Sequence, residues 1–185
     1  MLNKTKIANI PFGPYIAVLV GATVQGKPNY TTIGAYGIVS QKPVLYVSLK
    51  NTHYSTRGIL ETGWFSVNIP DESLLKKVDT CGVLSGNQTD KSSLFSSFYD
   101  PLSPAPMIKD CPVNYLCQVT QKIPVFDFTL FLGEIKATYA TPSCLQENQP
   151  DATKVKPILL MNTGYFGVKD RLGNVFQEGR TQSGF

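Results

Sequence analysis

Hydroxyl and amide side chains gather in three segments of the sequence, and each segment could serve a polar or anionic ligand. The first, residues 29–35, reads Asn-Tyr-Thr-Thr-Ile-Gly-Ala and carries two hydroxyls and one amide just before Gly34. These groups suit the flat polar edge of a ligand that lies along exposed backbone. A threonine-rich strand selected for its β-propensity has the same composition, so this segment alone leaves both interpretations open.

The second segment, residues 52–57, reads Thr-His-Tyr-Ser-Thr-Arg and stands at a predicted helix start. Asn51 or Thr52 can cap this helix. The first turn of a helix has free backbone N–H groups and the positive end of the dipole, which together with hydroxyls and Arg57 make a phosphate site. Ordinary helix capping explains the same residues equally well.

The third segment, residues 82–91, reads Gly-Val-Leu-Ser-Gly-Asn-Gln-Thr-Asp-Lys. Its two glycines permit a tight turn and a close approach of backbone to a ligand. Lys91 ends the segment as a mobile cation. The alternative is a solvated loop without a ligand.

Several common catalytic and metal-binding patterns are absent from the sequence. His53 is the only histidine, and no serine or cysteine nucleophile motif accompanies it. No G-x-G-x-x-G follows a predicted strand, and no G-x-x-x-x-G-K-[ST] loop occurs. The four cysteines, Cys81, Cys111, Cys117 and Cys144, form no C-x-x-C pair. We therefore expect no metal site and interpret the cysteines as buried thiols that behave as small apolar residues.

The elements that must position these segments are mainly strands. A hairpin is predicted from residues 15–23 and 29–33 around a Gln-Gly-Lys-Pro turn. Short helices are predicted over residues 54–62 and from residue 71 to just before residue 82. The further strands are expected at residues 44–49, 64–69, 113–123, 126–139, 157–162 and 165–168. Six or seven strands with two short helices favour a closed antiparallel barrel, and the stretches 82–112 and 141–156 are expected to be loops.

The composition limits the class of protein. A chain of 185 residues corresponds to one domain, over residues 1–185. Charged residues make up only 16%, against about 25% in typical soluble domains. Because this leaves few charged side chains for the surface, we expect a subunit that covers part of itself with a second copy.

Charge and hydropathy argue against two classes of partner. The net charge is +4, and the basic residues are scattered, so the pattern of a nucleic-acid-binding protein is absent. The apolar stretch 10–24 is interrupted by Pro11, Gly13 and Pro14 and is too short to span a membrane. It also lacks a small-residue cleavage site of a signal peptide. We expect a cytoplasmic protein without a nucleic-acid or membrane partner.

The order of these segments and strands resembles the flavin reductase-like, FMN-binding split-barrel proteins, and is most similar to the flavoredoxin type. The G-x-x-S-G-x-x-x-D-K motif at residues 82–91 is the most specific part. Before it come P-x-x-x-V-S-L at 43–49, T-x-x-x-T at 52–56 and F-x-V-N at 65–68. The resemblance runs from about Pro14 to Gly179 and implies an antiparallel, Greek-key-like split β-barrel with a few short helices.

The resemblance also implies non-covalently bound FMN near the interface of a homodimer. The residues that it assigns to the cofactor are Asn29, Thr31, Thr32, Ala35, Ser48, Leu49, Thr52, His53, Ser55, Thr56, Lys91 and Phe166.

Some of these residues receive separate roles from the resemblance. The polar residues of 29–32 would face the flavin ring or ribityl chain, and Thr56 with Ser55 would take the phosphate. Lys91 would add a cation, and Phe166 would pack on the cofactor.

Two departures from the family pattern concern the ring and the substrate pocket. The family often has an aromatic residue where this chain has Ala35, and Tyr36 could take its place. A histidine that some members carry near residues 126–132 is absent. Because flavin itself supplies the redox chemistry, no catalytic side chain is required.

The resemblance predicts an oxidoreductase that passes electrons through FMN from NAD(P)H or a partner reductase. Two alternatives remain: a non-enzymatic FMN-binding or storage protein, and a β-barrel module without a cofactor.

Overall fold

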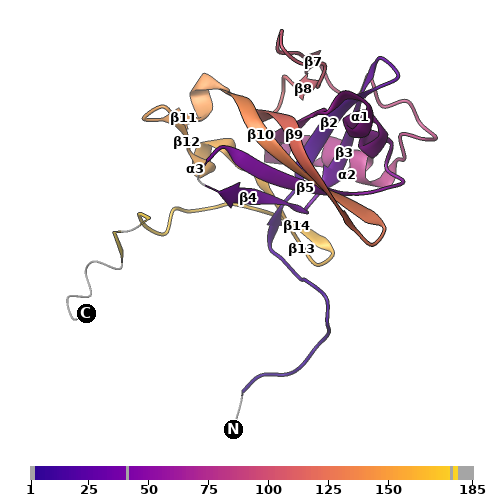
Figure 1. Ribbon diagram of the computed structural model, residues 1–185. Helices are drawn as coiled ribbons and strands as arrows, with labels where there is room; N and C mark the ends of the chain where they lie inside the picture. The colour runs from indigo at the N-terminus through magenta and orange to yellow at the C-terminus, as the bar shows by residue number, and fades with distance from the viewer. Residues whose placement is uncertain (1–2, 41, 176, 179–185) are drawn as a thin grey trace.

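Figure 1 shows the computed structural model of the chain, which describes residues 3–40, 42–175 and 177–178. A seven-stranded antiparallel sheet forms the body, with the strand order β3-β2-β6-β9-β10-β5-β4. Its strands are β2 (Val18–Val24), β3 (Lys27–Ile33), β4 (Tyr36–Ser40), β5 (Val44–Lys50), β6 (Trp64–Ile69), β9 (Val113–Val125) and β10 (Phe128–Ala140). The prediction of a mainly β fold with a few short helices is confirmed.

The main core lies on the concave face of this sheet. In β5, Leu45, Val47 and Leu49 are buried while the residues between them are not, which is the period-two alternation of a strand with one covered face. Helix α1 (Tyr54–Thr62) closes one end and contributes Ile59 to the same core. A Cβ at Gly58 would lie 2.4 Å from the Thr23 carbonyl oxygen, so only glycine allows this approach of α1 to β2.

A second core lies on the opposite face of β2 and β3. Helix α2 (Leu75–Val83) packs there through Val78 and Cys81, after the one-turn 3₁₀ helix η1 (Glu72–Leu74). The Tyr30 ring meets Phe95 edge-on at 5.4 Å between centroids, and the Tyr30 hydroxyl pairs with Ser97. Strand β3 therefore has Tyr30 in this core, while its neighbours Asn29 and Thr31 project from the other face.

The last two strands differ from the prediction. They were expected to close the barrel, but β13 (Ile158–Met161) and β14 (Gly164–Gly167) form a separate three-stranded sheet with β1 (Tyr15–Ile16). Strand β4 was not predicted; it pairs with β5 across a register shift between Ile38 and Ser40, which interrupts its alternation. The stretches predicted as loops contain the short elements β7 (Ser97–Phe98), β8 (Met107–Ile108), η2 (Pro142–Cys144), β11 (Leu145–Gln146), β12 (Gln149–Pro150) and α3 (Ala152–Val155).

All four cysteines are buried as free thiols, as predicted. None of the helices in the described part of the chain is long and apolar enough to cross a membrane. The segments before β1 and after β14 leave the body in different directions (Figure 1).

Candidate functional site

The first and second polar segments meet at the buried face of β3. Asn29 and Thr31 are two residues apart, so both side chains point to the same side, and they are 4% and 8% exposed. The Asn29 amide Nδ2 donates to Ser55 Oγ at 2.7 Å. Because its Oγ accepts this bond, the Ser55 hydroxyl proton remains available to a ligand.

Helix α1 begins next to these residues without a side-chain cap. His53 is the N-cap residue in extended conformation, and it makes no capping hydrogen bond. Its Nδ1 is buried and has no hydrogen-bond partner among the described residues. Burial and the nearby cations Lys50 and Lys91 lower the pKa of His53. An unpaired buried nitrogen of this kind calls for an explanation, and a ligand that binds beside it would provide one.

Lys91 supplies a cation from the third segment. The residue is 4% exposed, and its Nζ donates to the Leu84 carbonyl at 3.0 Å and to the Cys81 carbonyl at 3.4 Å. These carbonyls belong to the C-terminal end of α2, where the helix dipole favours a positive charge. Burial lowers the pKa of Lys91, and no carboxylate pairs with it among the described residues. An ammonium group has three donors, so one remains for a ligand.

Residues 84–91, called the strap below, cross from the end of α2 to the β2–β3 turn. Lys27 Nζ lies 2.9 Å from an Asp90 carboxylate oxygen, and Asn87 Nδ2 donates to the Thr52 carbonyl at 2.9 Å. A Cβ on Gly86 would lie 2.6 Å from Asn29 Oδ1, so the strap touches β3 only because this residue is glycine. These contacts hold Lys91 against β3 and α1.

The strap, β3, α1 and α2 enclose a cavity of about 110 Å³, called the inner pocket below. It brings together five of the predicted cofactor residues from all three polar segments. Its lining consists of Asn29, Thr31, His53, Tyr54, Ser55, Cys81, Gly82, Val83, Leu84, Ser85, Gly86 and Lys91. No carboxylate lines it, so the inner pocket is suited to an anion.

Thr56 and Thr32 lie close by, but their hydroxyls have other partners. Thr56 is 1% exposed and its Oγ1 donates to the Lys50 carbonyl at 2.8 Å. A phosphate only accepts hydrogen bonds, so this hydroxyl has no donor left for one. Thr32 Oγ1 donates to the Val78 carbonyl and ties β3 to α2. Both threonines position the walls of the inner pocket without lining it.

The remaining predicted residues do not line the inner pocket. Leu49 is fully buried in the main core, and Ser48 is half-buried on β5. The Ala35 carbonyl accepts from the Ser48 backbone N–H at 2.9 Å, and Thr52 is exposed. Phe166, on β14, is 55% exposed and lines a separate apolar hollow.

Cys81 and Tyr54 are among the lining residues that the predicted cofactor set does not include. Cys81 lies beside Lys91, and burial raises the pKa of the Cys81 thiol to about 11 although the neighbouring ammonium opposes the shift. Its place directly before Gly82, at the end of α2, was the available signal. The Tyr54 hydroxyl donates to Gln25 Oε1 at 3.1 Å and joins α1 to the β2–β3 turn; no sequence pattern pointed to this contact.

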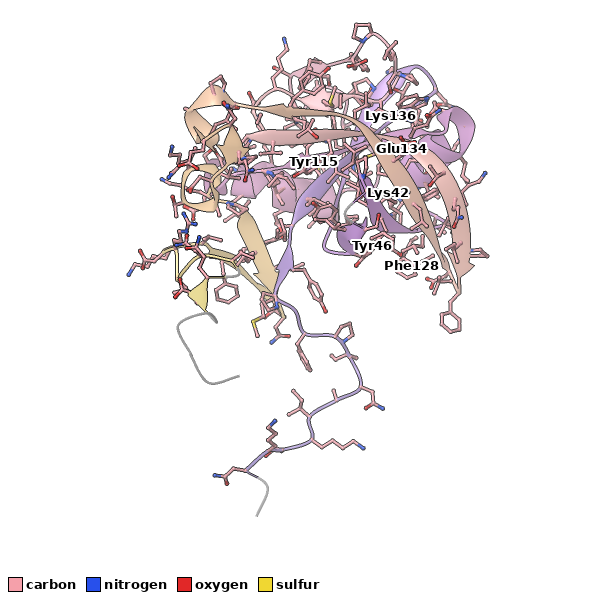
Figure 2. All side chains as sticks on the ribbon, turned by 60° about the vertical axis from the view of Figure 1, so that its left-hand side comes forward. Lys42, Tyr46, Tyr115, Phe128, Glu134 and Lys136 are labelled. Carbon is pink, nitrogen blue, oxygen red and sulfur yellow. The ribbon has the colours of Figure 1, made fainter. Side chains whose placement is uncertain are left out.

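The convex face of β10 and its neighbours carries an apolar band, which consists of Ile123, Val125, Phe128, Leu130, Leu132 and Tyr46. Leu130 stands opposite Ile123 and Ser48, and Leu132 stands opposite Tyr46; Figure 2 labels Tyr46 and Phe128. The outer face of an antiparallel sheet is ordinarily polar, whereas Ile123 and Val125 here remain 39% and 44% exposed. The face that carries the apolar band continues along β5 to Lys50. The Lys50 carbonyl accepts hydrogen bonds from the start of α1.

Comparison with known proteins identifies the family to which the chain belongs. The sequence profile of the flavin reductase like domain matches residues 13–169. The chain belongs to this family. The resemblance noted from the sequence is therefore confirmed, and membership supports a flavin-linked redox function.

Individual relatives agree with this assignment. The crystal structure of flavoredoxin from Methanosarcina acetivorans is 38% identical, with a TM-score of 0.93 over 97% of this chain and 99% of that one. The NADH-dependent flavin reductase StyB of Pseudomonas fluorescens is 26% identical over 84% of each chain. An uncharacterized protein of Archaeoglobus fulgidus is 36% identical over 113 residues, which are 59% of this chain and 63% of that protein. The fold is the split barrel of the flavin reductase family.

Proposed function

We propose that this protein binds FMN and passes electrons through it, with NAD(P)H or a reduced redox protein as the donor. The inner pocket is the observation that carries the proposal. A buried, carboxylate-free ammonium at Lys91 faces an uncapped helix start and an unpaired buried nitrogen at His53. This combination suits the terminal phosphate of FMN, which only accepts hydrogen bonds.

The size of the inner pocket favours binding of the FMN phosphate there over binding of the flavin ring. About 110 Å³ is well below the roughly 300 Å³ at which pockets for whole small molecules begin. The pocket therefore takes the phosphate end, and the ring lies outside it. Val83 and Leu84 are 74% and 39% exposed where they border the pocket. They offer the apolar contact that a flavin ring needs.

In this assignment each residue has a binding task. FMN, when bound, supplies the electron-transfer chemistry. Lys91 and the first N–H groups of α1 stabilise the phosphate charge, and the Ser55 hydroxyl donates to a phosphate oxygen. His53 donates from Nδ1 once protonated. Asn29 and Thr31 hydrogen-bond to the polar part of the cofactor nearest the phosphate.

The proposal includes a homodimer whose interface contains the apolar band. The low charged fraction of 16% and the uncovered apolar side chains both favour a second copy on this face. Because the band reaches Lys50, beside the start of α1, a second copy would lie close to the inner pocket. It could then cover the part of FMN that the inner pocket cannot enclose.

One experiment tests the proposal. Protein purified with added FMN and then desalted should keep the visible absorbance of flavin. Anaerobic addition of NADH or NADPH, or of a reduced ferredoxin, should then bleach this absorbance. Flavin that stays bound but is not reduced by any of these donors would instead indicate a storage protein. Loss of all flavin on desalting, with no saturable FMN binding, would reject the cofactor.

A further inference from the structure

The sequence places an aspartate directly before the lysine that faces the inner pocket. A carboxylate beside an ammonium group would ordinarily pair with it and cancel the charge that a phosphate needs. In the structure the Asp90 carboxylate has other partners. One of its oxygens lies 2.9 Å from Lys27 Nζ, and the other accepts from the Ser92 backbone N–H at 2.8 Å. Both oxygens of Asp90 are therefore engaged without Lys91.

Lys91 keeps its charge available although Asp90 is its neighbour in the chain. No carboxylate among the described residues forms an ion pair with it. Its Nζ donates to the backbone carbonyls of Leu84 and Cys81 instead. Burial lowers the pKa of Lys91, whereas a paired carboxylate would raise it. The ammonium group can therefore serve a ligand in the inner pocket.

A tight hairpin holds Lys27 opposite the strap. Strands β2 and β3 are joined by Gln25 and Gly26, which both lie in the left-handed region with φ of 50° and 76°, as in the short turns of many hairpins. Lys27 follows as the first residue of β3. The Tyr54 hydroxyl donates to Gln25 Oε1 at 3.1 Å and ties the turn to α1. The position of Lys27 is thus set by the hairpin and α1 as well as by Asp90.

The pair of Lys27 and Asp90 lies on the surface but close to the inner pocket. The two side chains are 69% and 55% exposed, and exposed ion pairs contribute little to the stability of a fold. Lys27, Asp90 and Lys91 all line a hollow of about 280 Å³ between the β2–β3 turn and the strap. Because Lys91 also lines the inner pocket, a phosphate bound there would interact with charges in this hollow.

Loss of the Lys27 ammonium group would leave the Asp90 carboxylate unpaired beside the phosphate site. The carboxylate would then either turn to Lys91 and neutralise it, or stay in the hollow and repel the phosphate. Both outcomes weaken the binding of a phosphate, and neither acts on a ligand that has no phosphate. With Lys27 in place, the pair is neutral as a unit, and the strap presents the single positive charge of Lys91.

We propose that Lys27 determines the preference of the inner pocket for a flavin that carries a phosphate, because it holds the Asp90 carboxylate away from Lys91 and from the bound phosphate. Lys27 is a positioning residue in this role and need not touch the cofactor. The inference rests on the proposed function, since it takes the inner pocket as the phosphate site.

The test is a double-mutant cycle in which FMN and riboflavin affinities are measured by titration. Lys27→Met should lower FMN affinity about threefold or more at low ionic strength, and added salt should reduce this loss because exposed charges are screened. Riboflavin affinity should not change. Asp90→Asn keeps an oxygen for the Ser92 N–H and should bind FMN at least as tightly as wild type.

The combination of the two substitutions gives the sharpest readout. The double variant Lys27→Met/Asp90→Asn should recover the wild-type affinity for FMN, because no carboxylate remains to be held. Lys27→Arg should also keep the wild-type preference for FMN. Lys136→Met is the matched control, since Lys136 pairs with Glu134 at 2.6 Å on β10 (Figure 2) and its loss removes the same charge.

Two results would overturn the inference. One is an unchanged ratio of FMN to riboflavin affinity in Lys27→Met. The other is a loss of FMN affinity in Asp90→Asn that persists in the double variant, which would mean that the pair only fastens the strap. Failure of the proposed function itself has a different signature, because wild-type protein would then bind FMN no better than riboflavin.

Discussion

Replacing Lys91 by methionine should weaken FMN binding and leave riboflavin binding nearly unchanged. Methionine keeps much of the lysine stem but removes the ammonium group that faces the inner pocket. A hydrogen bond to a charged group contributes roughly 1.5–3 kcal/mol, which corresponds to about a tenfold to hundredfold loss of affinity. Riboflavin has no phosphate, so it loses none of this contribution.

The same substitution should stabilise the protein without flavin. Burial lowers the pKa of Lys91, which means that its charged form is less favourable in the folded chain than in water. At neutral pH the charge of Lys91 therefore stabilises the unfolded chain relative to the folded chain. An uncharged methionine side chain removes this contribution to the free energy of unfolding. The flavin-free K91M protein should unfold at a higher temperature than wild type.

Fluorescence titrations with FMN and riboflavin, and thermal unfolding without flavin, measure these effects. Lys76→Met is the matched control, because Lys76 is an exposed lysine on α2. The wild-type preference for FMN over riboflavin should also decline as the pH rises. Because burial lowers the pKa of Lys91, this decline should begin at a lower pH than the ordinary lysine pKa of about 10.4 would give. K91M should not show this decline. Equal loss of FMN and riboflavin affinity in K91M would refute the assignment of Lys91 to the phosphate.

Three other substitutions test separate parts of the site and the interface. Thr56→Val should lower the free energy of unfolding by about 1 kcal/mol, the value of one hydrogen bond. In titrations it should change FMN and riboflavin affinity equally. A loss of affinity specific to FMN would instead place Thr56 in the phosphate site. His53→Gln should remove an advantage in FMN affinity that wild type gains as the pH falls from neutral. That advantage arises because a bound phosphate favours the protonated ring, whose pKa is low in the flavin-free protein; parallel pH profiles for the two proteins would contradict the role. Leu132→Arg, in the apolar band, should convert the dimer into a monomer, as measured by sedimentation at micromolar concentration. Thr138→Arg, at an exposed position farther along β10, should leave the dimer intact. A wild-type monomer that retains FMN would reject the dimer.

The sequence predicts the large elements of this fold well because their patterns are local. The alternation through Leu45, Val47 and Leu49 identifies β5, and Gly63, with a φ of 72°, ends α1 where the glycine signal placed the stop. The small sheet of β1, β13 and β14 could not be predicted in the same way. Its two-residue and four-residue strands are too short to show a period, and their partners are far apart in the sequence.

The site shows the same division between local and long-range information. The residue types of the three polar segments predict a site for a polar or anionic ligand, and five of the predicted residues do line one cavity. Thr56 and Thr32 could not be separated from them, because their carbonyl partners, Lys50 and Val78, become neighbours only after folding. The sequence shows which residues carry hydroxyl groups. It does not show which of these hydroxyls will form hydrogen bonds to backbone carbonyls in the folded chain.

A crystal structure of the protein with FMN tests the central claim most directly. We predict that the phosphate lies in the inner pocket, within hydrogen-bonding distance of Lys91 Nζ and the first N–H groups of α1, with His53 Nδ1 facing a phosphate oxygen. A phosphate bound elsewhere, with Lys91 still bonded only to the α2 carbonyls and His53 Nδ1 still unpaired, would contradict it.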